Sequence, residues 1–141
     1  MVDVTAKDVT ARTATAAGRL CTTAEVVAAL RGDDLPKGDA LAAARIAGVM
    51  GAKRTPDLVP LCHPIGVHGV AVELSLGETY VDITAVVKTA DRTGVEMEAL
   101  TAVSVAGLTL FDMVKAVDPA AVLTDVRVLS KTGGKTGSWR R

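Results

Sequence analysis

Apolar and polar residues alternate with a period of two in several segments of the chain, which predicts β-strands there. Two of these segments, 67–76 and 79–89, are separated only by Gly77 and Glu78, so we expect them to pair as an antiparallel hairpin. The segments are 11–21, 67–76, 79–89 and 121–130.

Other segments carry helical patterns. The first helical segment opens with Thr22 and Glu25, which have the spacing of a capping box. The second is rich in Ala and Leu and follows Asp39, a residue type that caps helix N-termini. The third is the most apolar part of the chain and has no evident wet face. These segments are 22–31, 40–54 and 93–118.

The element order predicts an α+β fold. Residues 55–66 hold three of the five prolines, so we expect no regular structure there. Without the extra short helix, the order of strands and helices is that of ferredoxin-like folds, in which an antiparallel sheet has helices packed on one face. We expect a single domain over residues 1–141, with flexible ends at 1–10 and 132–141. A second copy of the chain is expected to cover the sheet face that lacks helices.

Composition excludes several classes of function. The sixteen basic and sixteen acidic residues cancel and aromatic residues are only 2%, which argues against nucleic acid as a partner. The longest uncharged run, 99–111, is too short to cross a membrane. The N-terminus is polar and the two cysteines make no disulfide framework, so we expect a cytoplasmic protein.

Charged residues at both ends of the long helix call for an explanation. Glu96 and Glu98 can be ordinary helix-start residues, with Thr93 and Glu96 forming a capping box. Asp112 and Lys115 can be a surface pair at i, i+3. However, Glu98 and Asp112 lie on roughly the same side of the helix and about 21 Å apart. The chain therefore has either two sites or one site that a second subunit completes.

Basic residues and a histidine occupy the loops. Lys37 precedes a helix N-terminus and His63 lies in a proline-bounded loop, while Lys131 and Lys135 lie in a glycine-rich tail. Each is more often a solvated loop residue, but with the carboxylates they suit proton transfer on a phosphorylated small molecule. Cys62 and the histidines lack the spacing of a zinc site, and the "GGKTG" tail lacks the first glycine of a P-loop, so we predict no metal site.

Four motifs carry a resemblance to a known family. The chain closely resembles the cyclic pyranopterin monophosphate synthase (MoaC) family of molybdenum cofactor biosynthesis over almost its whole length. The matching motifs are "MVDVTAKDVTARTA", "KGDALAAARIAGVMGAKRTPDLVPLCHPIGV", "TGVEMEALTAVSVAGLTLFDMVKAVD" and "KTGGKTG". Departures from the family pattern include Ala90, Asp91 and Val114, none of which is a matched functional residue.

The resemblance implies an activity and an assembly. The family has a ferredoxin-like fold and forms a hexamer, a trimer of dimers with active sites at the dimer interfaces. It converts 3′,8-cyclo-7,8-dihydroguanosine 5′-triphosphate to cyclic pyranopterin monophosphate and releases diphosphate. No cofactor is expected from the sequence, although a divalent cation can accompany the triphosphate.

The resemblance also implies roles for individual residues. Asp112 matches the family's catalytic acid or base, with Lys115 beside it in the D-M-x-K-A pattern. Basic residues expected to hold the triphosphate and assist proton transfer are Lys37, Lys53, Lys131 and Lys135. Residues expected to bind substrate in the L-C-H and M-E motifs are Leu61, Cys62, His63, Met97 and Glu98, with Glu96 adjacent.

Two other classes of function compete with this one. The first is a non-catalytic oligomeric module that binds a phosphorylated nucleotide through the same lysines. The second is a purely structural oligomer, in which Lys37 and Lys131 would bind no ligand. The charges at both ends of an apolar helix and the motif match argue against both.

Overall fold

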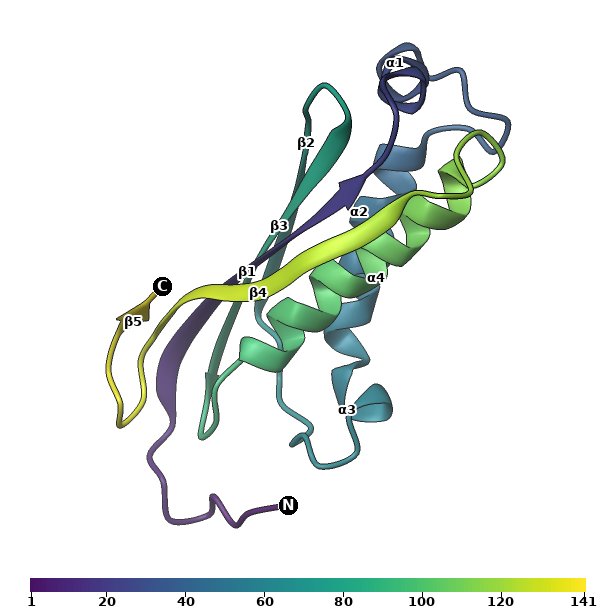
Figure 1. Cartoon of the computed structure of the whole chain (residues 1–141). Helices are drawn as coiled ribbons and strands as arrows, with labels where there is room; N and C mark the ends of the chain where they lie inside the picture. Colours follow the sequence, from purple (N-terminus) through teal and green to yellow (C-terminus); the bar gives the residue numbers. More distant parts are fainter.

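The computed structural model describes residues 1–141 and contains one antiparallel sheet with helices on one of its faces (Figure 1). The strands are β1 (Thr10–Cys21), β2 (Gly69–Leu76), β3 (Tyr80–Asp91), β4 (Val122–Thr132) and β5 (Trp139–Arg140). The helices are α1 (Ala24–Gly32), α2 (Ala40–Lys53), α3 (Thr55–Leu58) and α4 (Glu96–Val114).

The strand order confirms the predicted ferredoxin-like arrangement. The sheet runs β2-β3-β1-β4-β5, so β1 lies in the middle between β3 and β4. The predicted hairpin is present, with Val72 opposite Ala85. β5 was not predicted: the C-terminal tail turns back, and Trp139 pairs with Lys131 of β4.

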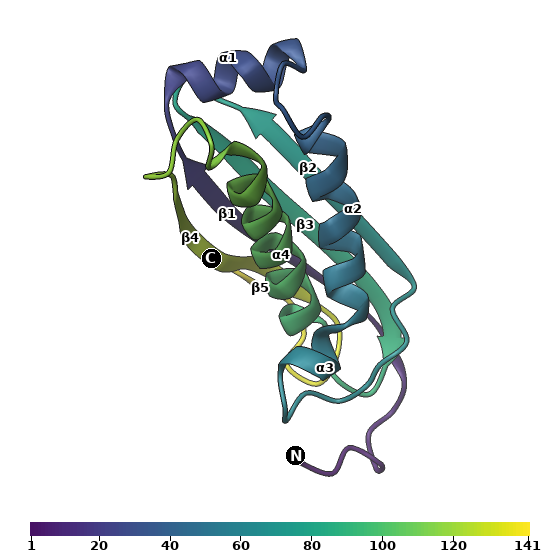
Figure 2. The same cartoon turned by 90° about the vertical axis from the view of Figure 1, so that its right-hand side faces the viewer.

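Helices α2 and α4 lie side by side on one face of the sheet and run in opposite directions (Figure 2). Gly48 of α2 allows this close contact, because a Cβ there would lie 3.0 Å from the backbone oxygen of Ala102. Helix α4 is long and apolar enough, by length and composition, to cross a membrane. Here it contributes buried residues such as Val103 and Leu110 to the core, as the central helix of a globular fold does.

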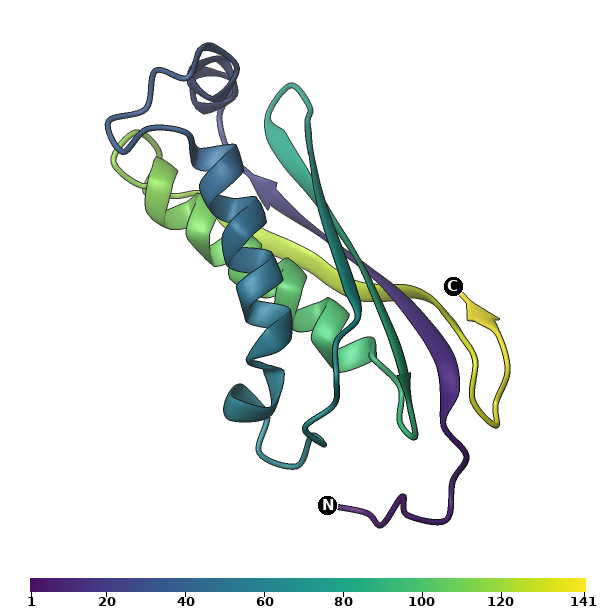
Figure 3. The same ribbon diagram turned by 180° about the vertical axis from the view of Figure 1, so that it is seen from behind.

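The opposite face of the sheet carries no helix (Figures 1 and 3). Its side chains are more polar than those of the core face. Arg19 of β1 forms an ion pair with Asp82 of β3 at 2.7 Å and stacks over the ring of Tyr80. The expectation that a second copy covers this face stays a prediction.

Two predicted helix starts are wrong in detail. The N-cap of α1 is Thr23, which accepts a hydrogen bond from the backbone N–H of Val26, while Thr22 donates to Asp118 instead. Helix α4 begins at Glu96 without any side-chain cap, so Thr93 and Glu96 form no capping box. The cap of α2 by Asp39 is confirmed.

The proline-rich segment is also more ordered than predicted. Residues Thr55–Leu58 form the single turn α3 directly after α2. Pro56 is compatible with this turn because a proline at the first helical positions loses no hydrogen bond. The remainder of the predicted irregular segment, residues 59–66, has no regular structure. The irregular connection continues through residues 67 and 68, which were predicted to begin the strand that starts at Gly69.

Candidate functional site

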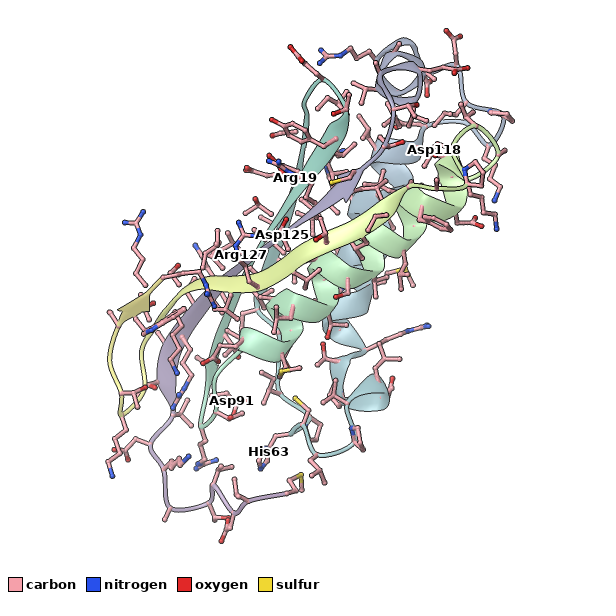
Figure 4. The ribbon with its side chains drawn as sticks, viewed as in Figure 1. Arg19, His63, Asp91, Asp118, Asp125 and Arg127 are labelled. Atoms are coloured by element: carbon pink, nitrogen blue, oxygen red, sulfur yellow. The ribbon has the colours of Figure 1, made fainter.

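The predicted site residues fall into two groups at opposite ends of α4. Figure 4 shows His63 near the N-terminal segment at one end of the molecule, and Asp118, which follows α4, at the other. One group surrounds Asp112 in the last turn of α4. The other surrounds a cleft at the first turn of α4. The separation predicted from the helix length is therefore present within the chain.

Asp112 lies between two lysines. Lys37 Nζ is 2.6 Å from its Oδ2, and Lys115 Nζ is 2.7 Å from its Oδ1. Lys37 also donates to the Asp112 carbonyl at 3.1 Å. All three side chains are about half exposed, so a ligand can reach them. We call these residues the Asp112 cluster.

The two lysines keep Asp112 ionised. Hydrogen bonds from Lys115 and then Lys37 lower the pKa of the Asp112 carboxyl from its ordinary 3.8 to about 2. At neutral pH the cluster is therefore one carboxylate that holds two ammonium groups in place. Asp112 can accept a proton only transiently, while the ammonium groups are available as proton donors and as partners for developing negative charge.

The second group lines a cleft of about 1160 Å³ beside the first turn of α4. Seven of the predicted site residues line this cleft. They are Leu61, Cys62, His63, Glu96, Met97, Lys131 and Lys135. The structure thus brings together three loops or element ends that are far apart in sequence. We call this feature the basic cleft.

Three cations of the basic cleft were not predicted as site residues. Lys7, Arg12 and Arg92 also line it, and the lining includes only two carboxylates, Asp8 and Glu96. The lining therefore has an excess of positive charge, which suits an anionic ligand. No local motif distinguishes these three residues, because they meet only when β1, β3 and the N-terminal segment are folded together.

Arg12 is held in a fixed orientation. Its Nε donates to the Asp91 carbonyl at 2.8 Å. The turn after β4 passes directly over its guanidinium, and a Cβ on Gly134 would overlap the Arg12 Nη1 atom. Gly134 has a positive φ of 75°, and this backbone conformation favours glycine at the turn.

Lys131 of β4 faces the start of α4. Its Nζ lies 2.8 Å from Glu96 Oε1, and both side chains are about one-third exposed or less. Glu96 therefore forms an ion pair with Lys131 instead of the predicted capping box with Thr93. A phosphate that enters the cleft can exchange with Glu96 for the Lys131 ammonium group.

The N-terminal segment closes one side of the cleft. His63 Nε2 lies 2.8 Å from the Val2 carbonyl, and Arg92 Nε donates to the Lys7 carbonyl at 2.9 Å. Val2, Lys7 and Asp8 all contribute to the lining. The imidazole of His63 therefore has a backbone partner at the position where substrate binding was predicted.

Glu98 does not face the cleft. Its side chain is 1% exposed, Oε1 lies 3.7 Å from the Cys62 thiol, and Oε2 is buried without a partner. Burial raises the pKa of the Glu98 carboxyl, and nearby Glu96 adds to this effect. Hydrogen bonds from its own backbone N–H and from Cys62 partly oppose it.

The raised pKa predicts how stability changes with pH. Below the ordinary value of 4.5 the carboxyl is neutral in both the folded and unfolded states, and it imposes no penalty. As pH rises through the folded pKa, the unfolded state ionises more readily and stability is lost. The Tm of Glu98→Gln minus that of the wild type should therefore increase between about pH 4 and 7. A constant Tm difference over this range would contradict the assignment.

Two predicted site residues, Glu98 and Lys53, lie outside both groups. Lys53 is exposed at the C-terminal end of α2, at the same end of the helix pair as the start of α4 (Figure 2), but it does not line the basic cleft. The structure contains no cluster of three or more His, Cys, Asp or Glu side chains arranged to hold a metal ion.

Comparison with known proteins gives a consistent result. The model of the MoaC family matches residues 1–134. A Streptomyces coelicolor protein named cyclic pyranopterin monophosphate synthase is 69% identical over 141 residues, which span 100% of this chain and 83% of the relative. A Nocardioides protein of the same name is 65% identical over 144 residues, with 88% of its length covered. Cyclic pyranopterin monophosphate synthase 2 of Mycobacterium tuberculosis is 61% identical, with 84% covered.

Proposed function

The chain belongs to the MoaC family, and we propose that it converts 3′,8-cyclo-7,8-dihydroguanosine 5′-triphosphate to cyclic pyranopterin monophosphate and diphosphate. The observation that carries this proposal is identity of up to 69% over the full chain to proteins named for that product. The enzyme thus acts in molybdenum cofactor biosynthesis. The two groups of site residues suit the two chemical demands of this reaction.

The first demand is the binding of a triphosphate and the release of diphosphate. When the cyclic phosphate closes, the bond between the α-phosphorus and the bridging oxygen breaks, and a substrate hydroxyl oxygen bonds to that phosphorus. The departing diphosphate gains negative charge, which cations beside it can stabilise. We assign this role to Lys131 and Lys135 of the basic cleft, together with Lys53 at the C-terminal end of α2. His63, Leu61 and Met97 would orient the remainder of the substrate.

The second demand is repeated proton transfer while the purine ring is rearranged. We assign it to the Asp112 cluster, in which Lys37 and Lys115 are held at 2.6 and 2.7 Å from one carboxylate. The ammonium groups would donate protons, and Asp112 would keep them oriented and accept protons transiently. Because Lys37 and Lys115 contact different oxygens of Asp112, they can serve two positions on the substrate.

The two groups would form one active site only across a subunit boundary. They lie at opposite ends of α4, whose 19 residues span roughly 28 Å at the usual rise. In a twofold dimer, the Asp112 cluster of one subunit can face the basic cleft of the other. We therefore propose a homo-oligomer with sites at dimer interfaces, and a hexamer built as a trimer of dimers.

The remaining requirements are modest. We propose that the reaction needs no resident cofactor, and that any divalent cation enters bound to the triphosphate. The substrate is a soluble nucleotide derivative, which fits a cytoplasmic enzyme without nucleic acid or membrane partners.

The activity is tested with the purified cyclo-dihydro intermediate. We expect one diphosphate to be released for each cyclic pyranopterin monophosphate formed, and GTP itself to give neither product. Tight binding of the intermediate without diphosphate release would instead indicate a non-catalytic binding module. An absence of any binding would indicate a structural oligomer.

A further inference from the structure

The three members of the Asp112 cluster are not held in the same way. Asp112 lies in the last turn of α4 and Lys115 is the residue at which that helix ends, so the helix itself fixes their spacing. Lys37 is 75 residues from Asp112 in sequence and lies in the loop between α1 and α2. Its Nζ nevertheless makes two contacts with Asp112, one to Oδ2 at 2.6 Å and one to the main-chain carbonyl at 3.1 Å. The placement of Lys37 therefore depends on the conformation of this loop.

A tight turn within the loop carries Lys37. The backbone N–H of Gly38 donates to the Leu35 carbonyl at 3.0 Å and closes a turn of four residues. Pro36 occupies the second position of this turn, where the fixed φ of proline is favourable. Leu35 is 7% exposed and belongs to the core, and it is the only buried residue of segment 31–39. The core thus anchors the turn at its first residue.

Gly38 connects this turn to helix α2. Its φ is 85°, in the left-handed region that favours glycine. The next residue, Asp39, caps α2 by accepting a hydrogen bond from the backbone N–H of Ala42 at 2.9 Å. A Cβ on Gly38 would have no atom within 4 Å, so packing does not require a glycine here. The backbone conformation alone favours it, and this conformation sets the direction in which the chain leaves Lys37 for the helix.

We propose that Gly38 is a positioning residue that acts through Lys37: its left-handed backbone holds the turn so that the Lys37 ammonium group reaches both the carboxylate and the carbonyl of Asp112. This inference rests on the proposed function of the Asp112 cluster. Two contacts with one residue define the position of the ammonium group more closely than a single ion pair would. They use two of its three N–H groups, and the third is free to donate to a substrate atom.

The exposure of Lys37 makes the turn important for its position. The Lys37 side chain is 47% exposed, so close packing does not hold it. Its orientation comes from the turn at one end and from Asp112 at the other. Because a displacement of about 1 Å at an active site can lower the rate by about 10²-fold, a change in the turn should be visible in catalysis.

The effect on Lys37 is tested without catalysis, by following the ¹³C signal of the Asp112 carboxyl carbon as pH is lowered. The pKa of this carboxyl is about 2, and Lys37 is one of the two lysines that lower it. Gly38→Ala should raise this pKa towards 3.8, by about as much as Lys37→Ala does. An unchanged pKa in Gly38→Ala would show that the glycine does not position Lys37, and it would overturn the proposal.

Gly137→Ala is the matched control for this titration. Gly137 has a φ of 67°, and a Cβ there would also have no atom within 4 Å. It lies in the C-terminal tail and lines neither the Asp112 cluster nor the basic cleft. Gly137→Ala should therefore leave the pKa of the Asp112 carboxyl unchanged. An equal rise of this pKa in both alanine variants would overturn the proposal, because the effect would not depend on the turn.

The positioning role is tested by kcat for diphosphate release from the cyclo-dihydro intermediate. Gly38→Ala should lower kcat by about 10- to 10²-fold with little change in KM, because the triphosphate is held by the basic cleft. Gly38→Asn should retain more activity, since asparagine adopts left-handed backbone more readily than alanine. In a Lys37→Ala background, Gly38→Ala should have no further effect. Effects that multiply in the double variant would show that Gly38 does not act through Lys37, which would overturn the proposal.

Failure of this inference and failure of the proposed function can be distinguished. If the wild type forms no product, the proposed function fails, but the titration still reports whether Gly38 positions Lys37. If the wild type is active and Gly38→Ala keeps both the pKa of the Asp112 carboxyl and kcat, only the positioning role fails. Circular dichroism and thermal unfolding of each variant separate both outcomes from loss of the fold.

Discussion

Asp112→Asn is expected to lower kcat for cyclic pyranopterin monophosphate formation by about 10²- to 10⁴-fold, the usual contribution of a positioned acid–base group. Asparagine keeps the size of the side chain but cannot hold both Lys37 and Lys115 by charge. The ammonium groups then lose the partner that orients them at 2.6 and 2.7 Å. Steady-state assay of diphosphate release, with the cyclo-dihydro intermediate at saturation, measures the effect.

Stability should hardly change in this variant. Asp112 is about half exposed, and solvent-exposed ion pairs contribute little to folding. Because the pKa of the Asp112 carboxyl is lowered, its ion pairs contribute to the stability of the fold at pH values above its ordinary pKa of 3.8. This contribution is lost only as pH falls towards about 2. The matched control is Asp82→Asn, which breaks an ion pair of similar exposure with Arg19 on the helix-free face. Near-normal kcat in Asp112→Asn, or an equal loss in Asp82→Asn, would contradict the catalytic assignment.

Lys131→Ala is expected to lower kcat/KM by about 10²- to 10³-fold, the range seen when one group that stabilises developing charge is removed. The substitution takes a cation from the basic cleft and leaves Glu96 without its partner at 2.8 Å. The cleft then has one fewer positive charge and a freed carboxylate facing the triphosphate. Both changes oppose the binding of an anion and the departure of diphosphate.

The comparison variant for Lys131 is Arg127→Ala. Arg127 lies on the same strand but outside the basic cleft, and Figure 4 places it beside Asp125 and Arg19 in the middle of the sheet. Removing its charge should therefore leave kcat/KM close to the wild-type value. Equal losses in Lys131→Ala and Arg127→Ala would indicate a general effect of net charge instead of a local triphosphate site.

The sheet and its covering helices could be predicted from the sequence because their side chains alternate clearly between core and solvent. In β3, for example, Val81, Ile83 and Ala85 are buried, while the residues between them are not. Elements without such periodicity could not be predicted. The two residues of β5 and the single turn of α3 depend on contacts or chain geometry that no short pattern encodes.

The candidate site was predictable only in part. Motif resemblance identified residues as far apart as Lys37 and Asp112, which form an ion pair in the structure. Local pattern could not identify Arg12, because its neighbours Asp91 and Gly134 are distant in sequence. It also could not show that Glu98 is buried, since a glutamate in the first turn of a helix is usually exposed and favoured there by the helix dipole.

In the proposed oligomer, one active site takes its Asp112 cluster and its basic cleft from different subunits. Co-expression of differently tagged Asp112→Ala and Lys131→Ala chains, followed by two-tag purification, yields mixed oligomers from two nearly inactive variants. Each mixed twofold dimer would contain one intact site and one doubly altered site. Activity is expected to return, to roughly half of the wild-type value per mixed dimer. Mixed oligomers that remain as inactive as the single variants would contradict it.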